Sequence, residues 1–406
     1  MPLTRAERKC GMPISDRVRK GMAEGSWIRR MFEEGAALKK RYGEENVFDL
    51  SLGNPVMEPP PEFDRELRRL AENPSPGMHR YMPNAGYPEA RAAVAAQLSL
   101  ETEVKFTTND IVMTCGAAGA LNVVLKAILN QGDEVVIFAP YFAEYVHYIN
   151  HHYGVASVVP ADEQFIPRLD ALEAAMGDRT RAVLANSPNN PSGAVYDEEF
   201  LHRLGELLRK KEAQYGTQIF LISDEAYRKI IYDGLKYPPP SCYHPQSIVV
   251  NSYSKDLALP GERIGYIAVH PNCLQHDELI NGLIYCNRTL GFVNAPALMQ
   301  HIVRHLQGAT VSVSEYQRKR DFLYDHLTGM GYSVVKPRGA FYMFPKSPME
   351  DDVAFVRELQ QFKVLTVPGS GFGSAGYFRI SYCVEDGTLE GSLAGFRKAA
   401  QKFNLC

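Results

Sequence analysis

Short apolar runs alternate with segments of helical periodicity through the middle of the chain, from about residue 110 to residue 270. The runs are rich in Val and Ile and are bounded by turn-forming residues, which is typical of strands buried on both faces. Alternation of such strands with helices predicts an α/β fold built on a mainly parallel sheet. Seven strands are expected, at 111–114, 134–138, 156–159, 182–185, 218–222, 247–251 and 264–270.

The two ends of the chain have other patterns. A helix is expected to start near Ser26 and to end at Gly43, because apolar residues recur between them at roughly helical spacing. Near the other end, a long helical stretch at 295–332 is expected to lead into an α+β segment. The strands of that segment are expected at 341–344 and 377–382.

These patterns divide the chain into three parts, because 406 residues are too many for one ordinary core. We expect an N-terminal segment at 1–55 that packs with a small domain, a large domain at 56–300 and the small α+β domain at 301–406. Ligands of parallel sheets bind beyond the carboxyl ends of the strands. Functional side chains are therefore expected in the turns that follow the strands.

Composition and charge exclude several classes of protein. Hydrophobic residues make up 45% of the chain and charged residues 22%, which is the balance of a soluble globular protein. The net charge is −3 and no basic run stands out, which argues against nucleic acid or an anionic membrane as a partner. No apolar stretch approaches the roughly 20 residues that span a bilayer. Residues 1–20 lack the apolar core of a signal peptide, and the seven cysteines have no paired metal spacing, so a cytoplasmic location is expected.

One lysine follows an expected strand in a turn rich in hydroxyl groups. The sequence N-S-Y-S-K ends at Lys255, and Arg263 follows it in P-G-E-R-I-G. An enzyme that forms a Schiff base needs one amine among groups that bind an anion, here the hydroxyl of Ser252 and the guanidinium of Arg263. The alternative is an ordinary surface lysine in a solvated turn.

Three other turns after strands carry candidate chemistry. Small residues let the backbone N–H groups of Ala117 and Ala118 approach an anion at a helix N-terminus, unless they only make a tight turn. Prolines and a glycine fix Asn190, whose amide can donate to a phenolate-type oxygen, unless these residues only form the turn. Asp224 can pair with a cationic ring nitrogen, unless it is a helix cap.

An arginine occupies an alternating apolar strand near the C-terminus. Arg379 lies in F-R-I-S-Y, where an inward guanidinium is costly unless it meets an anion. A bidentate contact with a carboxylate ligand would meet that need, and a structural ion pair is the alternative.

Two further patterns predict no site. The sequence at 371–376 matches G-x-G-x-x-G but leads into an expected strand, whereas a dinucleotide site requires a helix there. His147 and His151 have the spacing of two metal ligands on one helix, but no third ligand accompanies them, so no metal is expected.

Taken in chain order, the motifs N-N-P-S-G, S-D-E-A-Y, S-Y-S-K, P-G-E-R-I-G and R-I-S resemble those of the class I and II aminotransferases. This family contains fold-type I enzymes that depend on pyridoxal 5'-phosphate and are related to aspartate aminotransferase. The resemblance extends from about Asp49 to Tyr382. It implies a large domain with a mainly parallel seven-stranded sheet, a smaller α+β domain, and transfer of an amino group between an α-amino acid and a 2-oxo acid.

The resemblance implies three catalytic residues. Lys255 would hold the cofactor covalently and later move the α-proton of the substrate. Asp224 would keep the pyridine nitrogen protonated, which makes the ring an electron sink. Tyr227, together with Asn190, would form hydrogen bonds with the 3-oxygen of the cofactor.

It also implies how the phosphate is held. Ser252, Arg263 and the backbone of Ala117 and Ala118 would bind it, with Tyr81 supplied by the partner subunit of a homodimer. Some relatives carry hydroxyl groups in the loop where this chain has Gly-Ala-Ala, so the other groups would contribute more here.

The substrate would lie beside the cofactor ring, which would stack on Phe142. Arg379 would bind the α-carboxylate of the substrate in a pocket that Gly53, Asn54 and Asn190 also line.

The motifs leave the substrate and the reaction open. Arg288 lies in about the region where dicarboxylate-specific relatives carry a second substrate arginine, but a structural arginine fits that position equally well. Lys255, Asp224 and Arg379 would also serve a β-eliminating C–S lyase or a decarboxylase on the same scaffold. A non-enzymatic regulator that binds the cofactor is a third interpretation, and the complete set of catalytic positions argues against it.

Overall fold

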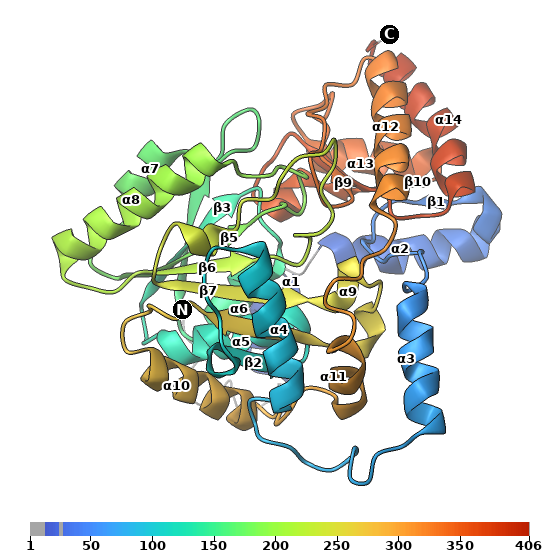
Figure 1. The fold of residues 1–406 in the computed structure, drawn as a ribbon. Helices are drawn as coiled ribbons and strands as arrows, with labels where there is room; N and C mark the ends of the chain where they lie inside the picture. Colours follow the sequence, from blue (N-terminus) through green and yellow to red (C-terminus); the bar gives the residue numbers. More distant parts are fainter. Residues whose placement is uncertain (1–12, 24–26, 406) are drawn as a thin grey trace.

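The computed structural model describes residues 13–23 and 27–405, and a seven-stranded sheet forms its centre (Figure 1). Strand β8 runs antiparallel to both of its neighbours, β2 and β7. The five strands β7, β6, β5, β3 and β4 pair with one another in parallel. The predicted mainly parallel sheet is therefore confirmed. In spatial order the strands are β2 (Ile111–Thr114), β8 (Gly265–Val269), β7 (Ser247–Ser252), β6 (Phe220–Asp224), β5 (Thr180–Asn186), β3 (Glu134–Ala139) and β4 (Val155–Pro160).

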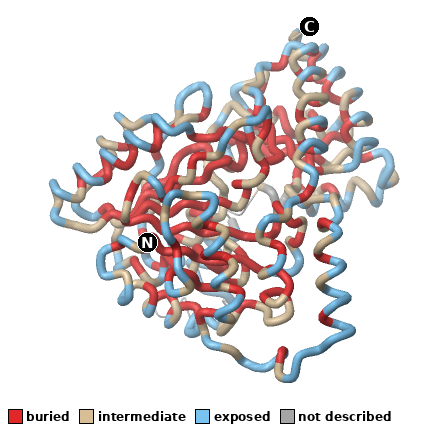
Figure 2. The backbone as a smooth tube through the Cα atoms, in the orientation of Figure 1, coloured by how far each residue is buried: buried red, intermediate tan, exposed pale blue. Residues whose placement is uncertain are grey.

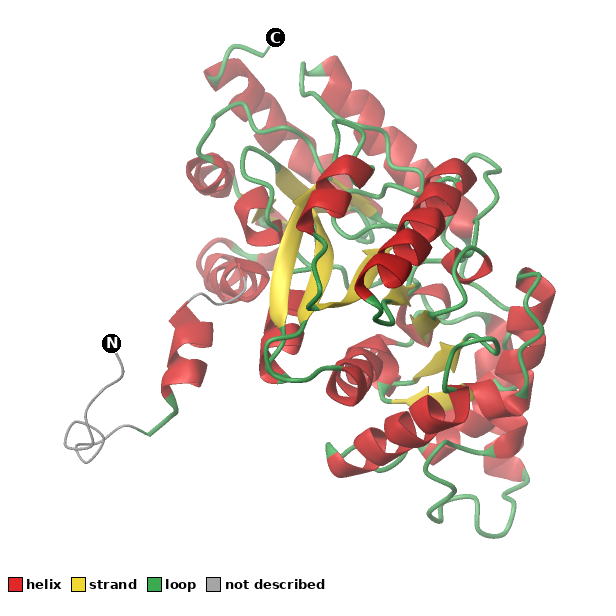
Figure 3. Cartoon of the chain, turned by 90° about the vertical axis from the view of Figure 1, so that its left-hand side faces the viewer, coloured by secondary structure: helices red, strands yellow, loops and turns green. Residues whose placement is uncertain are grey.

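Alternate residues of the strands other than the edge strand β4 enter different cores, which is why these strands are mostly apolar. In β3, Val135 and Ile137 join one buried cluster, whereas Val136 and Phe138 join another. Figure 2 shows the middle of the sheet as a buried region, and Figure 3 shows helices on both sides of the sheet. The covering helices are α4 (Pro88–Glu101), α5 (Gly116–Ile128), α6 (Glu144–His151), α7 (Leu169–Ala175), α8 (Glu198–Tyr215), α10 (His276–Thr289) and α11 (Ala297–Val303).

A second core lies beside the sheet and combines residues of the segment 27–50 with the C-terminal part of the chain. Three antiparallel strands, in the order β11 (Val367–Pro368), β12 (Phe378–Ser381) and β9 (Tyr342–Met343), pack with three helices. The helices are α12 (Val313–Gly329), α13 (Asp352–Gln361) and α14 (Asp386–Lys402).

The N-terminal segment joins this second core. Strand β1 (Phe48–Asp49) pairs in parallel with β10 (Val364–Leu365), and Met31 of α2 (Trp27–Tyr42) is fully buried in the same cluster. Helix α2 ends before Gly43, whose φ of 89° suits glycine, and its expected start near Ser26 lies outside the described residues. The limits 1–55, 56–300 and 301–406 stay a prediction. The remaining helices are α1 (Asp16–Ala23), α3 (Pro61–Glu72) and α9 (Tyr253–Asp256).

The prediction of one long helical stretch over 295–332 is wrong. The structure divides it into α11 and α12, with an irregular segment at 304–312. In that segment the N–H of Val311 donates to the Asp256 carbonyl oxygen at 2.8 Å, and the Lys229 amine donates to the Ala309 carbonyl oxygen at 3.3 Å. These contacts with distant residues replace the local hydrogen bonds that a helix would make.

Candidate active site

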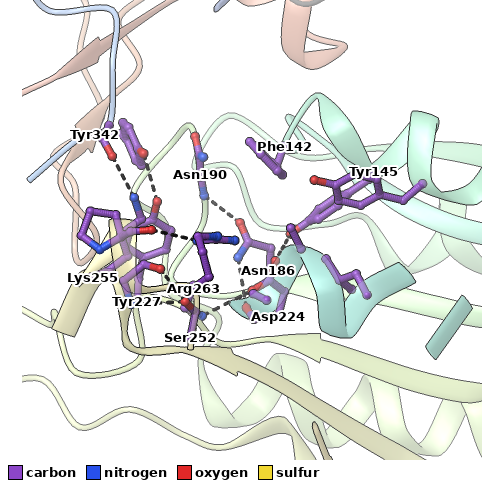
Figure 4. Close-up of a pocket in the computed structure, with 18 of the residues that line it drawn as sticks. Phe142, Tyr145, Asn186, Asn190, Asp224, Tyr227, Ser252, Lys255, Arg263 and Tyr342 are labelled. Atoms are coloured by element: carbon purple, nitrogen blue, oxygen red, sulfur yellow. Dashed lines mark hydrogen bonds between the residues drawn. The ribbon is translucent and has the colours of Figure 1, made fainter. Parts of the chain in front are cut away.

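A cavity of about 270 Å³ lies at the carboxyl ends of β5, β6 and β7, where a parallel sheet is expected to bind ligands. The second core closes it through β9 and β12. Figure 4 shows the labelled side chains reaching into this space from separate elements. The predicted site residues that line it are Gly53, Ala117, Ala118, Phe142, Asn190, Asp224, Tyr227, Ser252, Lys255, Arg263 and Arg379.

Two predicted residues lie outside the cavity lining. Asn54 is exposed, although its neighbour Gly53 contributes to the cavity wall. Tyr81 lies in the connection between α3 and α4, and 91% of its surface is exposed. A tyrosine that reaches into the cavity of a partner subunit has to be accessible in the single chain. The exposed position of Tyr81 is therefore compatible with its expected role at the phosphate site of a partner subunit.

The amine of Lys255 is held inside the cavity by the N-terminal segment. Lys255 belongs to the short helix α9, which Ser252 caps by accepting a hydrogen bond from the Ser254 N–H at 3.2 Å. The Lys255 amine donates to the Gly53 carbonyl oxygen at 2.8 Å. Burial lowers the pKa of Lys255 to about 8, and the positive charges of Arg379 and Arg263 act in the same direction. The alternative of a solvated surface lysine does not fit this environment.

Asp224 ends strand β6 as a buried carboxylate. The Tyr145 hydroxyl donates to it at 2.6 Å, and the Asn186 amide donates to its backbone carbonyl at 3.0 Å. Burial raises the pKa of Asp224, although the hydrogen bond from Tyr145 opposes this. No helix begins directly after Asp224, so the alternative of a helix cap is excluded.

The N-terminus of α5 faces the cavity without a side-chain cap. Ala117 and Ala118 line the cavity, and the N-cap residue Cys115 makes no capping hydrogen bond, so the first N–H groups of the helix remain available to an anion. Arg263 lies beside them, with its guanidinium donating to the Pro260 carbonyl oxygen at 2.9 Å. A Cβ on Gly116 would lie 2.9 Å from that guanidinium, and the φ of Gly116 is 73°, so glycine is needed there.

Arg379 enters the cavity from β12 and is only 1% exposed. Its guanidinium donates to the Asn190 side-chain oxygen at 3.1 Å and to the Ser51 carbonyl oxygen. It lies over the rings of Tyr342 and Phe372, with its central carbon 4.7 and 4.8 Å from their centres. Because a guanidinium cannot accept a hydrogen bond, Asn190 has to turn its oxygen toward Arg379, which leaves its NH₂ group for a ligand.

Charges line the cavity without a protein counter-charge. Lys255, Asp224 and Arg379 contact hydroxyl, amide and carbonyl groups, and none forms an ion pair with another described residue. The structural ion pair considered for Arg379 is therefore absent from the described part of the chain. Buried charges of this kind are costly unless a ligand compensates them. The arrangement suits a ligand with an anion near α5, a cation near Asp224 and a carboxylate near Arg379.

Several cavity residues were not predicted from the sequence, among them Tyr145, Asn186 and Tyr342. Tyr145 contacts Asp224, Asn186 accepts a hydrogen bond from the Asn190 N–H at 2.8 Å, and Tyr342 contacts Tyr227. Asn186 is the last residue of β5 and directly follows the strand expected at 182–185, so this position could have identified it as a candidate. Tyr145 and Tyr342 carry no such signal, because their partners are 79 and 115 residues away.

The patterns that predicted no site do not line the cavity, although the ring of Phe372, from the glycine motif, packs against Arg379. The glycine motif at 371–376 precedes strand β12, and His147 and His151 lie on α6. Within the described ranges, no three His, Cys, Asp or Glu side chains gather in a way that could hold a metal ion. None of the described helices is both long enough and apolar enough to cross a membrane.

Comparison with known proteins agrees with the geometry. The family model described as Aminotransferase class I and II matches residues 45–394. A probable aspartate/prephenate aminotransferase of Aquifex aeolicus is 32% identical over 379 residues, which cover 88% of this chain and 92% of that protein. A probable aspartate aminotransferase of Methanocaldococcus jannaschii is also 32% identical, with 86% of this chain and 92% of that protein covered.

Solved structures share the fold over nearly the whole chain. An amino transferase from Eubacterium rectale superposes with a TM-score of 0.94 and 40% identity, covering 97% of this chain and all of that chain (100%). An aspartate aminotransferase from Thermus thermophilus with maleate gives a TM-score of 0.84 and 28% identity, with 96% and 100% covered. The predicted fold-type I architecture is confirmed. From its motifs, its fold and these matches, the chain belongs to the aminotransferase class I and II family and is an aminotransferase.

Proposed function

We propose that this aminotransferase uses pyridoxal 5'-phosphate to move an amino group between an α-amino acid and a 2-oxo acid. The observation that carries the proposal is the placement of three charges without protein counter-charges, Lys255, Asp224 and Arg379, around one cavity. The aldehyde of the cofactor would react with Lys255, and its ring nitrogen would pair with Asp224. The carboxylate of the amino acid would bind Arg379.

When bound, pyridoxal phosphate supplies an aldehyde that reacts with amines and a ring that withdraws electrons from the substrate Cα. Lys255 would hold it covalently through its amine. Asp224 would pair with the ring nitrogen, and Tyr145 would keep the carboxylate of Asp224 oriented by its 2.6 Å hydrogen bond. Tyr227 and the NH₂ group of Asn190 would donate to the 3-oxygen, and Phe142 would stack on the ring.

The phosphate is proposed to bind at the N-terminus of α5. The N–H groups of Ala117 and Ala118 would donate to it, with Ser252 and Arg263 beside them. We further propose a homodimer in which Tyr81 of one subunit reaches the phosphate of the other. The nearly complete exposure of Tyr81 supports this assignment. A cytoplasmic location is proposed on the scattered cysteines, of which the five described ones form no disulfide.

The reaction requires Lys255 to act twice. Once it is free, the Lys255 amine would act as a base beside the substrate Cα. Burial lowers the pKa of Lys255 to about 8, which favours the neutral amine that a base requires, and the amine donates to the Gly53 carbonyl oxygen at 2.8 Å. Arg379 would bind the α-carboxylate in bidentate fashion and so fix the orientation of Cα.

The names of two relatives point to acidic and to aromatic substrates. The Aquifex relative is named for aspartate and prephenate, and a Thermococcus litoralis relative for aromatic amino acids. In this chain Arg288 is exposed on α10, over the ring of Tyr285, and does not line the cavity. A role for Arg288 in the same subunit's cavity is therefore not proposed.

The test is a spectral screen of the purified protein loaded with pyridoxal phosphate. Each amino acid is mixed with the protein in the absence of an acceptor, and the change in visible absorbance is followed over a single turnover. Lys255→Ala should abolish turnover and the covalent link to the cofactor, whereas Lys346→Ala, at an exposed lysine outside the cavity, should behave as the wild type. An active Lys255→Ala variant would contradict the proposal. Release of pyruvate and ammonia from cysteine conjugates would instead indicate the C–S lyase.

A further inference from the structure

Tyr342 connects two residues to which the proposed function gives different tasks. It begins strand β9, lines the cavity and is only 2% exposed. Its hydroxyl lies 2.9 Å from the hydroxyl of Tyr227, and the guanidinium of Arg379 lies over the face of its ring. Figure 4 shows Tyr342 and Tyr227 on the same side of the cavity as Lys255.

The surrounding packing holds the Tyr342 hydroxyl in place. A Cβ on Gly53 would lie 1.8 Å from the Tyr342 hydroxyl oxygen, so the glycine at this position leaves the space that the hydroxyl fills. The ring of Phe341 packs beside the Tyr342 ring at 5.0 Å between centres, and the ring of Tyr227 meets it edge-on at 5.7 Å. The hydroxyl of Tyr342 is therefore fixed against Tyr227 by contacts on several sides.

The direction of the hydrogen bond follows from the chemistry of hydroxyl groups. A tyrosine hydroxyl has one proton to donate and an oxygen that can accept. If Tyr227 donates its proton to the 3-oxygen of the cofactor, it can only accept from Tyr342. The hydroxyls then form a chain that runs from Tyr342 to Tyr227 to the cofactor. In such a chain each hydrogen bond polarises the next one and strengthens it.

We propose that Tyr342 is a positioning residue, whose hydroxyl donates to Tyr227 and strengthens the hydrogen bond that Tyr227 donates to the cofactor oxygen. The inference rests on the proposed function, because it needs bound pyridoxal phosphate. A stronger donor stabilises the negative charge on the 3-oxygen, and this lowers the pKa at which the bound cofactor loses its proton. Tyr342 therefore helps to set the pH range in which the loaded enzyme is ready for substrate.

The test is a pH titration of the visible absorbance of the enzyme loaded with pyridoxal phosphate, without substrate. Tyr342→Phe removes only the hydroxyl and keeps the ring against Arg379. The midpoint should rise by about half a pH unit, which corresponds to the loss of the cooperative part of one hydrogen bond. The matched control is Tyr382→Phe. It removes another buried hydroxyl, which donates to the Tyr232 hydroxyl at 3.3 Å outside the cavity lining, and should leave the midpoint unchanged.

A double-mutant cycle shows whether Tyr342 acts through Tyr227. Tyr227→Phe alone should raise the midpoint further than Tyr342→Phe does, and adding Tyr342→Phe to it should change nothing more. An unchanged midpoint in Tyr342→Phe overturns the inference. The inference also fails if Tyr342→Phe shifts the midpoint of the Tyr227→Phe variant as much as it shifts that of the wild type. If the wild-type protein gains no visible absorbance with pyridoxal phosphate, the proposed function itself fails, which is a distinct result.

Discussion

Two fully buried arginines in the same part of the molecule differ in what surrounds them. Arg320 of α12 is bonded by both ends of its guanidinium to the carboxylate of Asp233, at 2.6 and 2.7 Å, and also contacts Asp321. Arg379 of β12 is equally buried, but its hydrogen bonds go to the neutral oxygens of Asn190 and Ser51. Each guanidinium also lies over an aromatic ring, at 4.7 Å from the ring centre.

The difference separates a charge that the protein itself neutralises from one that has no carboxylate partner in the described chain. Burial alone lowers the pKa of an arginine, but the hydrogen bonds and charges of Asp233 and Asp321 outweigh it and raise the pKa of Arg320. For Arg379, burial dominates and lowers the pKa. The folded chain thus compensates the charge of Arg320 itself, whereas for Arg379 the proposed function assigns this task to the carboxylate of the substrate.

Of the three predictions on this contrast, the largest effect is expected for Arg379→Lys, which should reduce catalysis. Lysine keeps the charge but cannot form the planar two-point contact with a carboxylate, so kcat/KM for the amino acid should fall by about 100-fold to 1,000-fold. Steady-state kinetics with several amino acids measures the loss. The free energy of unfolding of the cofactor-free protein should hardly change. A large loss of stability with unchanged kinetics would show that Arg379, like Arg320, stabilises the fold and does not bind the substrate.

The reverse pattern is expected for Arg320→Met. It removes the contacts with Asp233 and Asp321 and leaves the Pro337 carbonyl oxygen without its 2.9 Å hydrogen bond. Because both carboxylates are partly exposed, the free energy of unfolding should fall by about 2 to 3 kcal/mol, less than for a wholly buried pair. Urea unfolding measures this loss. The kcat/KM of the folded enzyme should stay within about threefold of the wild type, and a loss as large as that of Arg379→Lys would erase the contrast.

Lys255 is, like Arg379, a buried charge without a protein counter-charge. The effect expected for it is the smallest of the three and depends most on pH. Its folded-state pKa of about 8 lies below the value of about 10.4 for an unfolded lysine. The unfolded chain therefore binds more protons between these values, and stability increases as the pH rises through them. Lys255→Met should stabilise the cofactor-free protein by about 1 to 2 kcal/mol at neutral pH, and the gain should vanish as the pH approaches the unfolded value. Chemical unfolding at a series of pH values checks this, and a gain that does not depend on pH would contradict it.

Local patterns were sufficient to predict most of the sheet and the turns that carry Asp224 and Lys255. A buried parallel strand is a continuous apolar run, so its end can be located from neighbouring residues alone. The inward position of Arg379 was also predictable from its apolar strand, and the anion that would compensate it stays a prediction.

Features that depend on distant contacts were not predictable. The hydroxyl of Tyr342 meets Tyr227 only because β9 and the turn after β6 are brought together by the fold. The break at 304–312 has the same origin, since Asp256 and Lys229 bind its backbone from other elements. Nothing in the local sequence around these positions names such partners.

The hydrogen bond from Lys255 to the Gly53 carbonyl spans 202 residues of sequence, and the one from Arg379 to the Ser51 carbonyl spans 328. Closing such long loops has an entropic cost that local folding does not meet. The cavity is therefore complete only when the segment around Gly53 and the strand that carries Arg379 have both docked against the large sheet. A fragment that lacks either segment lacks part of the cavity wall.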